Sequence, residues 1–292
     1  MMVVGVTGAN GMLGRHIVDV LIDCGKEVKE ITRKEWDIKK EVSGQDLDSI
    51  FSDCDAVVHC AALTKDFSSE AECISVNVTS SACVAEWCYK QRVPLIYISG
   101  AGCYKLFGKL KVDEYSEMSY DCLGGAYGLS KYLGEQAILN IMRGACTVFR
   151  PSSLYGAGSP ADRVVAKFLN SAKKNEQITV WDDGSAINFL HCYDVARAVN
   201  SALNIGAYGT FNLANEESFS LLDLAKKICL VTGANPSLIN VKIKKQSKIK
   251  NKLALCFARA QREFGFHPKI DLVSGLRLAF NEKTLPEFDK NF

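Results

Sequence analysis

Residues 3–14 read VVGVTGANGMLG, an apolar run that ends at a threonine and is followed by glycines at positions 8, 11 and 14. This order predicts a buried strand, a tight turn and the start of a helix. Gly8 allows a sharp turn off the strand, Gly11 allows backbone amides to approach a phosphate, and Gly14 allows the helix to pack close to the sheet. The helix N-terminus directs its N–H groups at the phosphates. The stretch therefore predicts a dinucleotide site, and a glycine-rich turn without a ligand is the alternative.

The composition is that of an ordinary globular chain. The 292 residues are 48% hydrophobic and 23% charged, with a net charge of +2. This length is enough for one large α/β domain or for two unequal lobes. The small net charge gives no indication that nucleic acid or a membrane surface is the main partner. Because no apolar run reaches the roughly 18 residues of a membrane span, we expect no transmembrane helix. Since the N-terminus leads straight into the first predicted strand, we also expect no signal peptide and a cytoplasmic location.

The 12 cysteines are spread from Cys24 to Cys256, mostly within apolar segments. They form no CxxC pair and no cluster with histidine, which a zinc site would require. The pattern predicts buried free thiols in a reducing cytoplasm, with neither disulfides nor a structural metal.

Strand-like and helix-like segments alternate along the chain, which predicts parallel strands with helices on both faces. After the first strand, the first half has predicted helices at residues 12–24, 71–91 and 127–143 and predicted strands at 25–33, 55–62, 93–100 and 146–151. Beyond Pro151 the predicted helices are 161–173, 191–203 and 219–233, and the predicted strands are 178–185 and 209–215.

These segments predict an α/β fold, with a doubly wound parallel sheet of the Rossmann type and a smaller C-terminal α/β lobe. We expect residues 1–153 and about 189–213 to form the dinucleotide-binding domain. Residues of about 154–188 and 214–292 would form a substrate-binding lobe over the carboxyl ends of the strands, where such sheets bind ligands.

Tyr127 and Lys131, in the segment YGLSK, are the second informative feature. Residues four apart on a helix project from the same face, so the phenol and the ammonium can share one pocket. A phenol, with a reference pKa near 10, is a poor acid or base at neutral pH until a cation stabilises its phenolate. The lysine supplies that cation and can also donate a hydrogen bond to a ribose. This spacing also occurs by chance, and its position after the fourth strand is what gives it weight.

On these motifs, the chain resembles the extended short-chain dehydrogenases/reductases, in the group of sugar-nucleotide epimerases, dehydratases and reductases. The segments that carry the resemblance read TGANGMLG, DAVVHCAA, VPLIYISG, YGLSK, FRPSSLYG, FLHCYDVARAV, TFNLANEESFSLLDLA and REFGFHPKIDLVSGL, and they cover nearly the whole chain. Within the group, the segment TRKEWDI is most similar to the dTDP-4-dehydrorhamnose reductase branch.

The resemblance implies roles for individual residues. Tyr127 would donate a proton to a substrate carbonyl, with Lys131 as its partner and as a ribose ligand. Further cofactor contacts would come from Gly8, Asn10, Gly11, Met12, Leu13, Gly14, Asp37, Ile38, Ala61, Ala62, Asn77, Ser99 and Pro151. Among these, Asn77 is at a helix position that usually braces the strand ends.

Arg33 stands at the end of the second predicted strand, where NAD-preferring relatives often have an acid that accepts the ribose hydroxyls. An arginine there suits a 2′-phosphate instead. We therefore expect NADP as the cofactor, or the use of both NADP and NAD. A solvent-exposed arginine of no consequence is the alternative.

The predicted substrate contacts are Thr64, Gly100, Ala101 and Arg163. Relatives usually have a serine or threonine, which hydrogen-bonds the substrate carbonyl, where this chain has Gly100. Ser99 is one position away and would face the opposite side of the strand. Relatives that dehydrate their substrate have acids directly after that serine, and this chain has Ala101 and Gly102, so we do not expect dehydration.

A second departure concerns the grip on a nucleoside diphosphate. Relatives often have an arginine two residues before the aromatic residue of the segment INFLH, and this chain has Ile187 there. Arg163, or the six lysines within residues 242–252, are the candidates to replace it. The alternative is that these lysines form a solvated face.

We therefore expect an NAD(P)H-dependent reductase that acts on a keto sugar nucleotide, such as a 4-keto-6-deoxyhexose linked to a nucleoside diphosphate. Two alternatives stay open. One is a sugar-nucleotide epimerase with a tightly held NAD, and the other is a non-catalytic dinucleotide-binding sensor or assembly partner. A homodimer is common in relatives, through the helices near 71–91 and 127–143.

Overall fold

The computed structural model describes residues 1–40, 42–64, 67–104, 112–118, 124–243 and 254–286. Its central sheet has six strands in the described residues, in the spatial order β2-β1-β3-β4-β5-β9, and all neighbours are parallel. The strands are β1 (Val3–Thr7), β2 (Glu27–Ile31), β3 (Ala56–His59), β4 (Leu95–Ile98), β5 (Thr147–Pro151) and β9 (Gly209–Leu213). The strand order reverses between β1 and β3, which is where such sheets bind dinucleotides.

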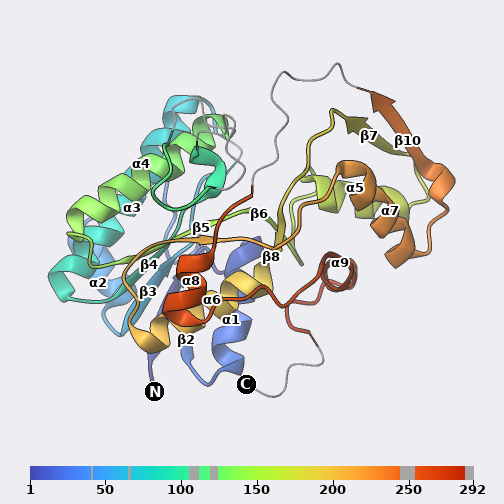
Figure 1. Cartoon of the computed structure of the whole chain (residues 1–292). Helices are drawn as coiled ribbons and strands as arrows, with labels where there is room; N and C mark the ends of the chain where they lie inside the picture. The colour runs from blue at the N-terminus through green and yellow to red at the C-terminus, as the bar shows by residue number, and fades with distance from the viewer. Residues whose placement is uncertain (41, 65–66, 105–111, 119–123, 244–253, 287–292) are drawn as a thin grey trace.

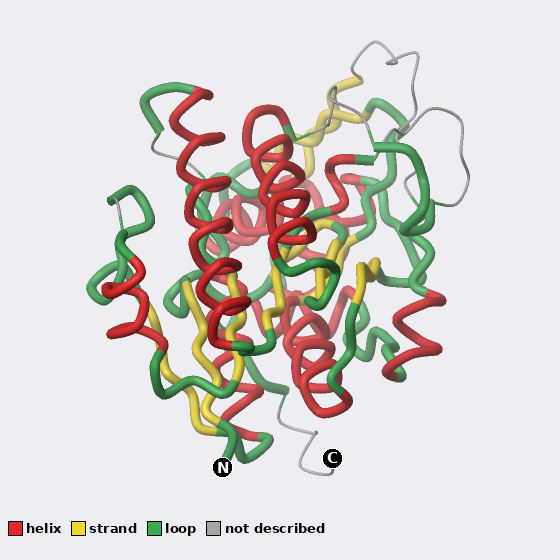
Figure 2. The backbone as a smooth tube through the Cα atoms, turned by 90° about the vertical axis from the view of Figure 1, so that its left-hand side faces the viewer, coloured by secondary structure: helices red, strands yellow, loops and turns green. Residues whose placement is uncertain are grey.

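Helices cover both faces of this sheet (Figure 1). One face packs against α1 (Met12–Asp23), α6 (Cys192–Ile205) and α8 (Ala258–Phe264). The other packs against α2 (Gly44–Phe51), α3 (Glu70–Gln91) and α4 (Gly125–Ile141). Figure 2 shows α3 and α4 side by side in front of the strands. The doubly wound parallel sheet that the sequence predicts is confirmed.

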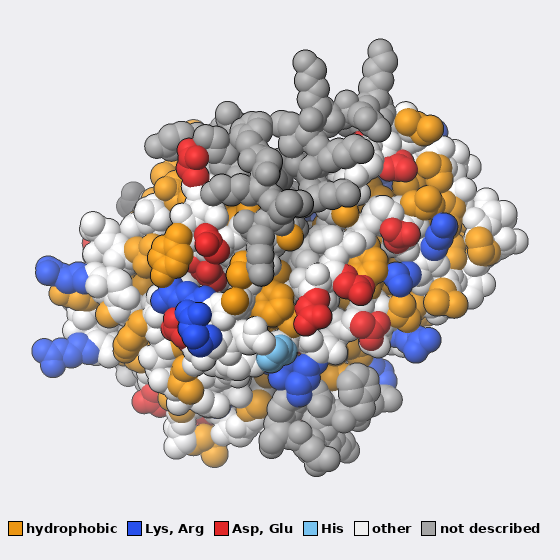
Figure 3. All heavy atoms as spheres, in the orientation of Figure 1, with side chains coloured by type: hydrophobic (Ala, Val, Ile, Leu, Met, Phe, Trp, Pro, Cys, Tyr) orange, Lys and Arg blue, Asp and Glu red, His pale blue; other side chains and the backbone are white. Residues whose placement is uncertain are grey.

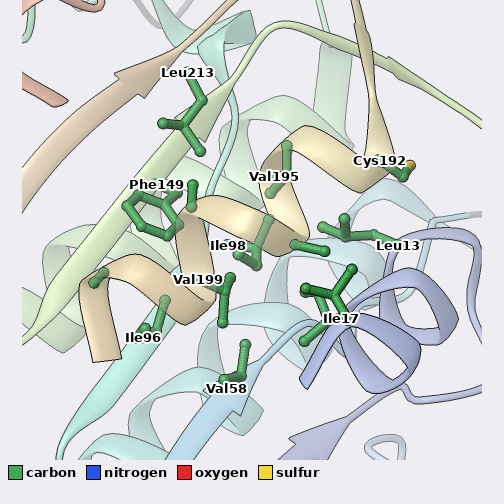
Figure 4. Packing of buried hydrophobic residues seen from close by; sticks show 14 of the residues in the cluster. Leu13, Ile17, Val58, Ile96, Ile98, Phe149, Cys192, Val195, Val199 and Leu213 are labelled. Atoms are coloured by element: carbon green, nitrogen blue, oxygen red, sulfur yellow. The ribbon is translucent and has the colours of Figure 1, made fainter. Parts of the chain in front are cut away.

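The apolar strand residues form the core beneath α1 and α6. Figure 4 shows Val58 and Phe149 of the sheet directed at Ile17 and Val199 of the helices, and all four side chains are completely buried. Each such side chain contributes about 1.5–3 kcal/mol relative to an exposed one. This burial is what fixes the helix after the glycine turn against the sheet.

A smaller α/β lobe lies beside the sheet (Figure 1). It is made of α5 (Val164–Lys173), β7 (Ile178–Asp182), α7 (Leu221–Thr232), β10 (Ile239–Ile243) and α9 (Leu272–Phe280), which enclose a hydrophobic core of their own. Strands β7 and β10 pair in parallel. Two short parallel strands, β6 (Ser153–Tyr155) and β8 (Phe189–His191), lie where the chain passes between the sheet and the lobe.

Strands β3 and β4 are shorter than the predicted strands at 55–62 and 93–100. Beyond β3, the amides of Cys60 and Ala61 donate to the Thr7 hydroxyl, each at 3.1 Å. The chain therefore leaves the sheet early to meet the end of β1. The sequence analysis did not predict α2, which begins at a capping box formed by Ser43 and Asp46.

Helix α8 lies outside the lobe to which the predicted boundaries assign it. Its Ala260 and Phe264 belong to the hydrophobic core beneath the sheet, where the Phe264 ring is 5.1 Å from that of Phe211 on β9. Predicted residues 214–292 therefore divide between the lobe and the sheet in their packing. The assignment of two functional domains remains a prediction.

Candidate active site

The three glycines of the first turn meet one another where β1 passes into α1. Gly8 has a φ of +68°, and its amide donates to the Ile31 carbonyl at the end of β2 at 2.8 Å. A Cβ at Gly11 would stand 3.0 Å from the Gly8 carbonyl oxygen, and one at Gly14 only 2.1 Å from it. A side chain is therefore excluded at position 14 by the path of the backbone, and a Cβ at position 11 would be in tight contact with the turn.

Helix α1 begins directly at this turn with Gly11 as its N-cap, and no side chain caps it. The first amides of a helix have no partner within the helix. At this N-terminus they are left for a ligand, and the helix dipole favours an anion there. A turn without side chains in front of an uncapped helix fits the pyrophosphate of a dinucleotide.

The loops after β2 and β3 border the same turn. A Cβ at Gly8 would stand 3.0 Å from the backbone of Ala61, so the end of β3 touches the turn. Arg33 is exposed two residues beyond Ile31, and Ile38 packs against the core near Trp36. The predicted residues at the adenosine end of the site therefore lie on segments that surround the glycine turn.

Asn77 connects three segments from its buried position on α3. Its side-chain oxygen accepts from the Leu63 amide at 2.6 Å, and its side-chain nitrogen donates to Ser130 Oγ on α4 at 2.8 Å. Ser130 Oγ in turn donates to the Tyr127 carbonyl at 2.7 Å. Ser130 was not among the predicted site residues. This relay holds the first turn of α4, which carries Tyr127, one helical turn before Lys131.

Tyr127 and Lys131 are one helical turn apart on α4, as predicted. Tyr127 is partly exposed and Lys131 is buried. The Lys131 ammonium lies over the ring of Tyr97 on β4, 4.1 Å from its centroid. The pair therefore combines a phenol that a ligand can reach with a cation that the fold holds in place.

Gly100 follows β4 in an extended conformation, with a φ of −169° and a ψ of 152° that any residue adopts. A Cβ at this position would have no neighbour within 4 Å. The next residue, Ala101, is buried at the start of a 3-10 turn (Ala101–Cys103). Ser99 is buried before it, and its hydroxyl has no hydrogen-bond partner in the described residues. Space alone therefore does not require a glycine at position 100.

A buried ion pair supports the far side of α4. Arg150 on β5 and Glu135, one turn beyond Lys131, form this pair, with Arg150 Nε 3.1 Å from one carboxylate oxygen. Arg150 also donates to the Tyr104 hydroxyl at 2.7 Å, and Tyr104 donates to Asn212 on β9 at 2.7 Å. Burial raises the pKa of Tyr104 to about 12. This network was not among the predicted features, although an arginine inside an apolar strand is a signal that an acid must lie nearby.

The remaining predicted residues are less closely gathered. Pro151 is buried in β5, and Thr64 is exposed in the loop after β3. Arg163 is exposed at the N-cap of α5, and its side chain makes no hydrogen bond or ion pair within the described part of the chain. Ile187 packs against the core of the lobe. Of the six predicted lysines only Lys242 is described, over the Trp181 ring, and the other five lie outside the described residues.

No group of three metal-ligating side chains occurs in the part of the chain that the structure describes. The cysteines described there are free thiols, and burial raises the pKa of Cys60 to about 12. No helix within the described ranges is long and apolar enough to span a membrane. On the face shown in Figure 3, Lys and Arg side chains are interspersed with Asp and Glu.

A parallel sheet with a three-glycine turn at its switch point, and a tyrosine–lysine pair on the helix after its fourth strand, defines an extended short-chain dehydrogenase/reductase. This is an NAD(P)-dependent class of oxidoreductases. The chain belongs to the RmlD substrate binding domain family, which matches residues 1–254. The predicted resemblance to the dTDP-4-dehydrorhamnose reductase branch is confirmed.

Two relatives show the same relationship. The chain is 30% identical over 263 residues to a dTDP-4-dehydro-6-deoxy-D-allose reductase from Streptomyces bikiniensis, covering 78% of this chain and 80% of the relative. It is 28% identical over 239 residues to a dTDP-4-dehydrorhamnose reductase from Mycobacterium tuberculosis, covering 80% of this chain and 77% of the relative.

Solved structures share the whole fold. The UDP-N-acetylglucosamine 4-epimerase from Bacillus cereus matches with a TM-score of 0.84 and 23% identity, over 96% of this chain and 99% of that protein. A dTDP-glucose 4,6-dehydratase from Bacillus anthracis, in complex with NAD, matches with a TM-score of 0.81 and 17% identity, over 97% and 96%. At these identities the likeness establishes the fold alone.

Proposed function

We propose that this protein is an NAD(P)H-dependent reductase of a keto sugar nucleotide, with a 4-keto-6-deoxyhexose linked to a nucleoside diphosphate as its substrate. The observation that carries the proposal is the pair of Tyr127 and Lys131, held on α4 by the relay from Asn77, within a chain of the RmlD family. Two relatives named as reductases of dTDP-linked keto sugars support the substrate class.

The dinucleotide is held along the carboxyl edge of β1 to β5. Its pyrophosphate lies against the glycine turn and the first amides of α1. The other cofactor contacts in this proposal are Asn10, Met12, Leu13, Asp37, Ile38, Ala61, Ala62, Ser99 and Pro151. The side-chain amide of Asn77 is already hydrogen-bonded to Leu63 and Ser130. Asn77 therefore braces the site and does not touch the cofactor.

When bound, the reduced nicotinamide supplies the hydride that the carbonyl carbon of the sugar receives. Tyr127 donates the proton that the carbonyl oxygen takes up. Lys131 stabilises the phenolate that this donation leaves, and it also binds the ribose. The fixed first turn of α4 keeps the phenol oriented, so that proton donor and carbonyl meet in contact geometry.

The substrate lies between the sheet edge and the lobe, with Thr64, Gly100, Ala101 and Arg163 as its contacts. In this proposal residues 1–153 and about 189–213 bind the dinucleotide, and residues of about 154–188 and 214–292 bind the sugar nucleotide. Arg33 gives a preference for NADPH, because a guanidinium beside the adenosine ribose suits a 2′-phosphate.

A panel of nucleoside-diphosphate 4-keto-6-deoxy sugars tests the proposal. Nicotinamide absorbance is followed with NADPH and with NADH, after calorimetry has established binding of each. Oxidation of the dinucleotide in the presence of one sugar of the panel supports the reductase. Binding of the dinucleotide without oxidation on any member would contradict it.

Gly100 favours one other candidate, a dinucleotide-binding protein without catalysis, because the usual hydroxyl donor is missing there. Removing one such donor typically lowers a rate about 100- to 1,000-fold. The same panel separates the two functions, since a sensor would bind NADPH but would not oxidise it with any sugar of the panel. The retained Tyr127 and Lys131 favour the reductase.

A homodimer through α3 and α4 is part of the proposal, since these two long helices pack side by side on one face (Figure 2). Light scattering of the purified protein measures the mass in solution. A mass near 32.0 kDa would contradict the dimer, because that is the mass of one chain.

A further inference from the structure

Tyr97, in the middle of β4, contacts Lys131 at two places. Its ring lies under the Lys131 ammonium at 4.1 Å, and its hydroxyl donates to the Lys131 carbonyl at 3.2 Å. Both residues are buried, with Tyr97 completely inaccessible and Lys131 4% exposed. One tyrosine of the sheet therefore holds both the backbone and the charged end of the lysine.

The Tyr97 ring also contacts a ring of the neighbouring strand. It stacks on His59 of β3 with centroids 5.9 Å apart and planes 23° apart, and His59 stacks on Trp36 at 6.0 Å and 26°. His59 Nδ1 lies 2.8 Å from the Thr7 hydroxyl. The row of rings thus runs beneath the site from the loop after β2 to the helix that carries Lys131.

Thr7 also defines the protonation of His59. Its hydroxyl oxygen already accepts from the amides of Cys60 and Ala61, so its single hydrogen points to His59 Nδ1. We assign His59 the neutral Nε2–H form on this basis. Burial, with a smaller effect from Lys131, lowers the pKa of His59 to about 3. A neutral ring can lie close to the ammonium without repelling it.

Helix α4 is shaped to accept the Tyr97 hydroxyl. A Cβ at Gly134 would stand 2.8 Å from that hydroxyl and 3.1 Å from Ser81 Oγ on α3. The glycine therefore leaves the space in which Tyr97 reaches the helix backbone. The contact between β4 and α4 therefore depends on Tyr97 and Gly134.

We propose that Tyr97 is a positioning residue of the active site: it holds the Lys131 ammonium where that cation stabilises the Tyr127 phenolate and meets the cofactor ribose. The proposal rests on the proposed function of the Tyr127 and Lys131 pair. A lysine side chain loses rotamer entropy when it is fixed in one position. The attraction of a desolvated ammonium for an aromatic ring offsets part of that loss.

The titratable groups near Lys131 in the described residues are either neutral or paired with another group. His59 of β3 and Cys60, which directly follows that strand, are neutral at pH 7, because burial lowers the pKa of the imidazole and raises that of the thiol. Glu135, the next acid along α4, is paired with Arg150 of β5. A change in the position of Lys131 is therefore expected to reach the Tyr127 phenol directly.

Tyrosinate absorbance tests this without any substrate. Each protein is titrated with alkali, and so is the same protein carrying the additional substitution Tyr127→Phe. The difference between the two absorbance curves isolates the ionisation of Tyr127. Tyr97→Phe keeps the ring and removes the hydroxyl, and Tyr97→Met removes the ring. Tyr155→Phe is the matched control, because its buried hydroxyl has no hydrogen-bond partner in the described residues.

We expect Tyr97→Met to raise the Tyr127 midpoint by about 0.5–1 pH unit and to weaken NADPH binding about three- to tenfold. In Tyr97→Phe the titration midpoint of Tyr127 should stay within about 0.3 pH unit of the parent value, since this variant retains the ring. Equal midpoints in the parent and in Tyr97→Met would overturn the proposal. So would an equal shift in Tyr155→Phe.

If Tyr97→Met does not fold, fluorinated phenylalanines placed at position 97 keep the shape of the ring and weaken its attraction for cations. The midpoint of Tyr127 should then rise with the number of fluorines, and a flat series would contradict the role of the ring. None of these readouts needs turnover. A protein that reduces no sugar nucleotide would refute the proposed function and leave the placement of Lys131 by Tyr97 still measurable.

Discussion

Gly14, on the first turn of α1, lies so close to Gly8 that a Cβ at position 14 would stand 2.1 Å from the Gly8 carbonyl oxygen. That distance is far inside any van der Waals contact, and the obstacle is backbone, which cannot move aside without opening the turn. The approach of helix to turn is what brings the first amides of α1 to the edge of the sheet. The shape of the dinucleotide site therefore depends on a missing side chain.

Gly14→Ala should weaken NADPH binding by a factor of 100 or more, because the helix must move away from the turn. Gly44→Ala is the control, since position 44 also lies in a first helical turn and a Cβ there meets nothing within 4 Å. Calorimetry measures both dissociation constants, and melting curves show whether each variant folds. A Gly14→Ala protein that is folded and binds as the parent does would refute the assignment of the turn.

Gly100→Ser should raise the rate of sugar reduction about 10- to 1,000-fold by supplying the missing hydroxyl donor. The extended backbone and the empty space around position 100 allow the side chain without strain. Gly100→Ala adds the same Cβ without the hydroxyl and should leave the rate near that of the parent. If the serine and alanine variants turn over equally, the hydroxyl has no role in this enzyme.

Arg33→Glu should weaken NADPH binding at least tenfold while NADH binding changes little, because a carboxylate repels the 2′-phosphate and can accept from the ribose hydroxyls. The exposed Arg262 on α8 offers a control, Arg262→Glu, with the same change in net charge. Calorimetry with both dinucleotides gives the ratio of the NADPH and NADH dissociation constants. If this ratio is the same in Arg33→Glu as in the parent, Arg33 is a solvent-exposed side chain that does not contact the cofactor.

Three buried histidines make stability depend on pH. Burial lowers the pKa of His16 to about 4 and those of His59 and His191 to about 3. In the unfolded chain a histidine titrates near 6.5. Between about pH 6.5 and 4 the unfolded chain therefore binds protons that the folded chain does not, and stability falls as the pH falls. Asp194 acts in the opposite direction below pH 6, because burial raises its pKa to about 6.

Each such group changes the free energy of unfolding by up to about 1.4 kcal/mol per pH unit, so three histidines against one aspartate leave a loss of up to about 3 kcal/mol per unit below pH 6. Urea unfolding at pH 7.5, 6 and 5 measures this loss. Stability that is constant or rises between pH 7.5 and 5 would contradict the neutral buried histidines.

Local patterns predicted the parts of the site that local geometry determines. The glycines at 8, 11 and 14 follow from one turn, and the pairing of Tyr127 with Lys131 follows from one helical repeat. The parallel sheet followed from the alternation of elements. These features depend on neighbours within a few residues, so a single sequence carries them.

Contacts between distant segments left no such pattern. Tyr97 reads only as one apolar residue of a buried strand, and its contact with Lys131 spans 34 positions in the chain. The contact of Thr7 with His59 spans 52, and that of Asn77 with Ser130 spans 53. Packing of β3, β4 and α4 brings these side chains together, and neither periodicity nor propensity encodes which partner each one meets.

The rate of a single turnover, measured in the parent and in Tyr127→Phe with NADPH and the sugar nucleotide that the panel identifies, tests the central claim most directly. If Tyr127 donates the proton, the rate should fall about 100- to 10,000-fold in the variant, while the dissociation constant of NADPH changes by less than about threefold. Undiminished turnover in Tyr127→Phe would contradict the account.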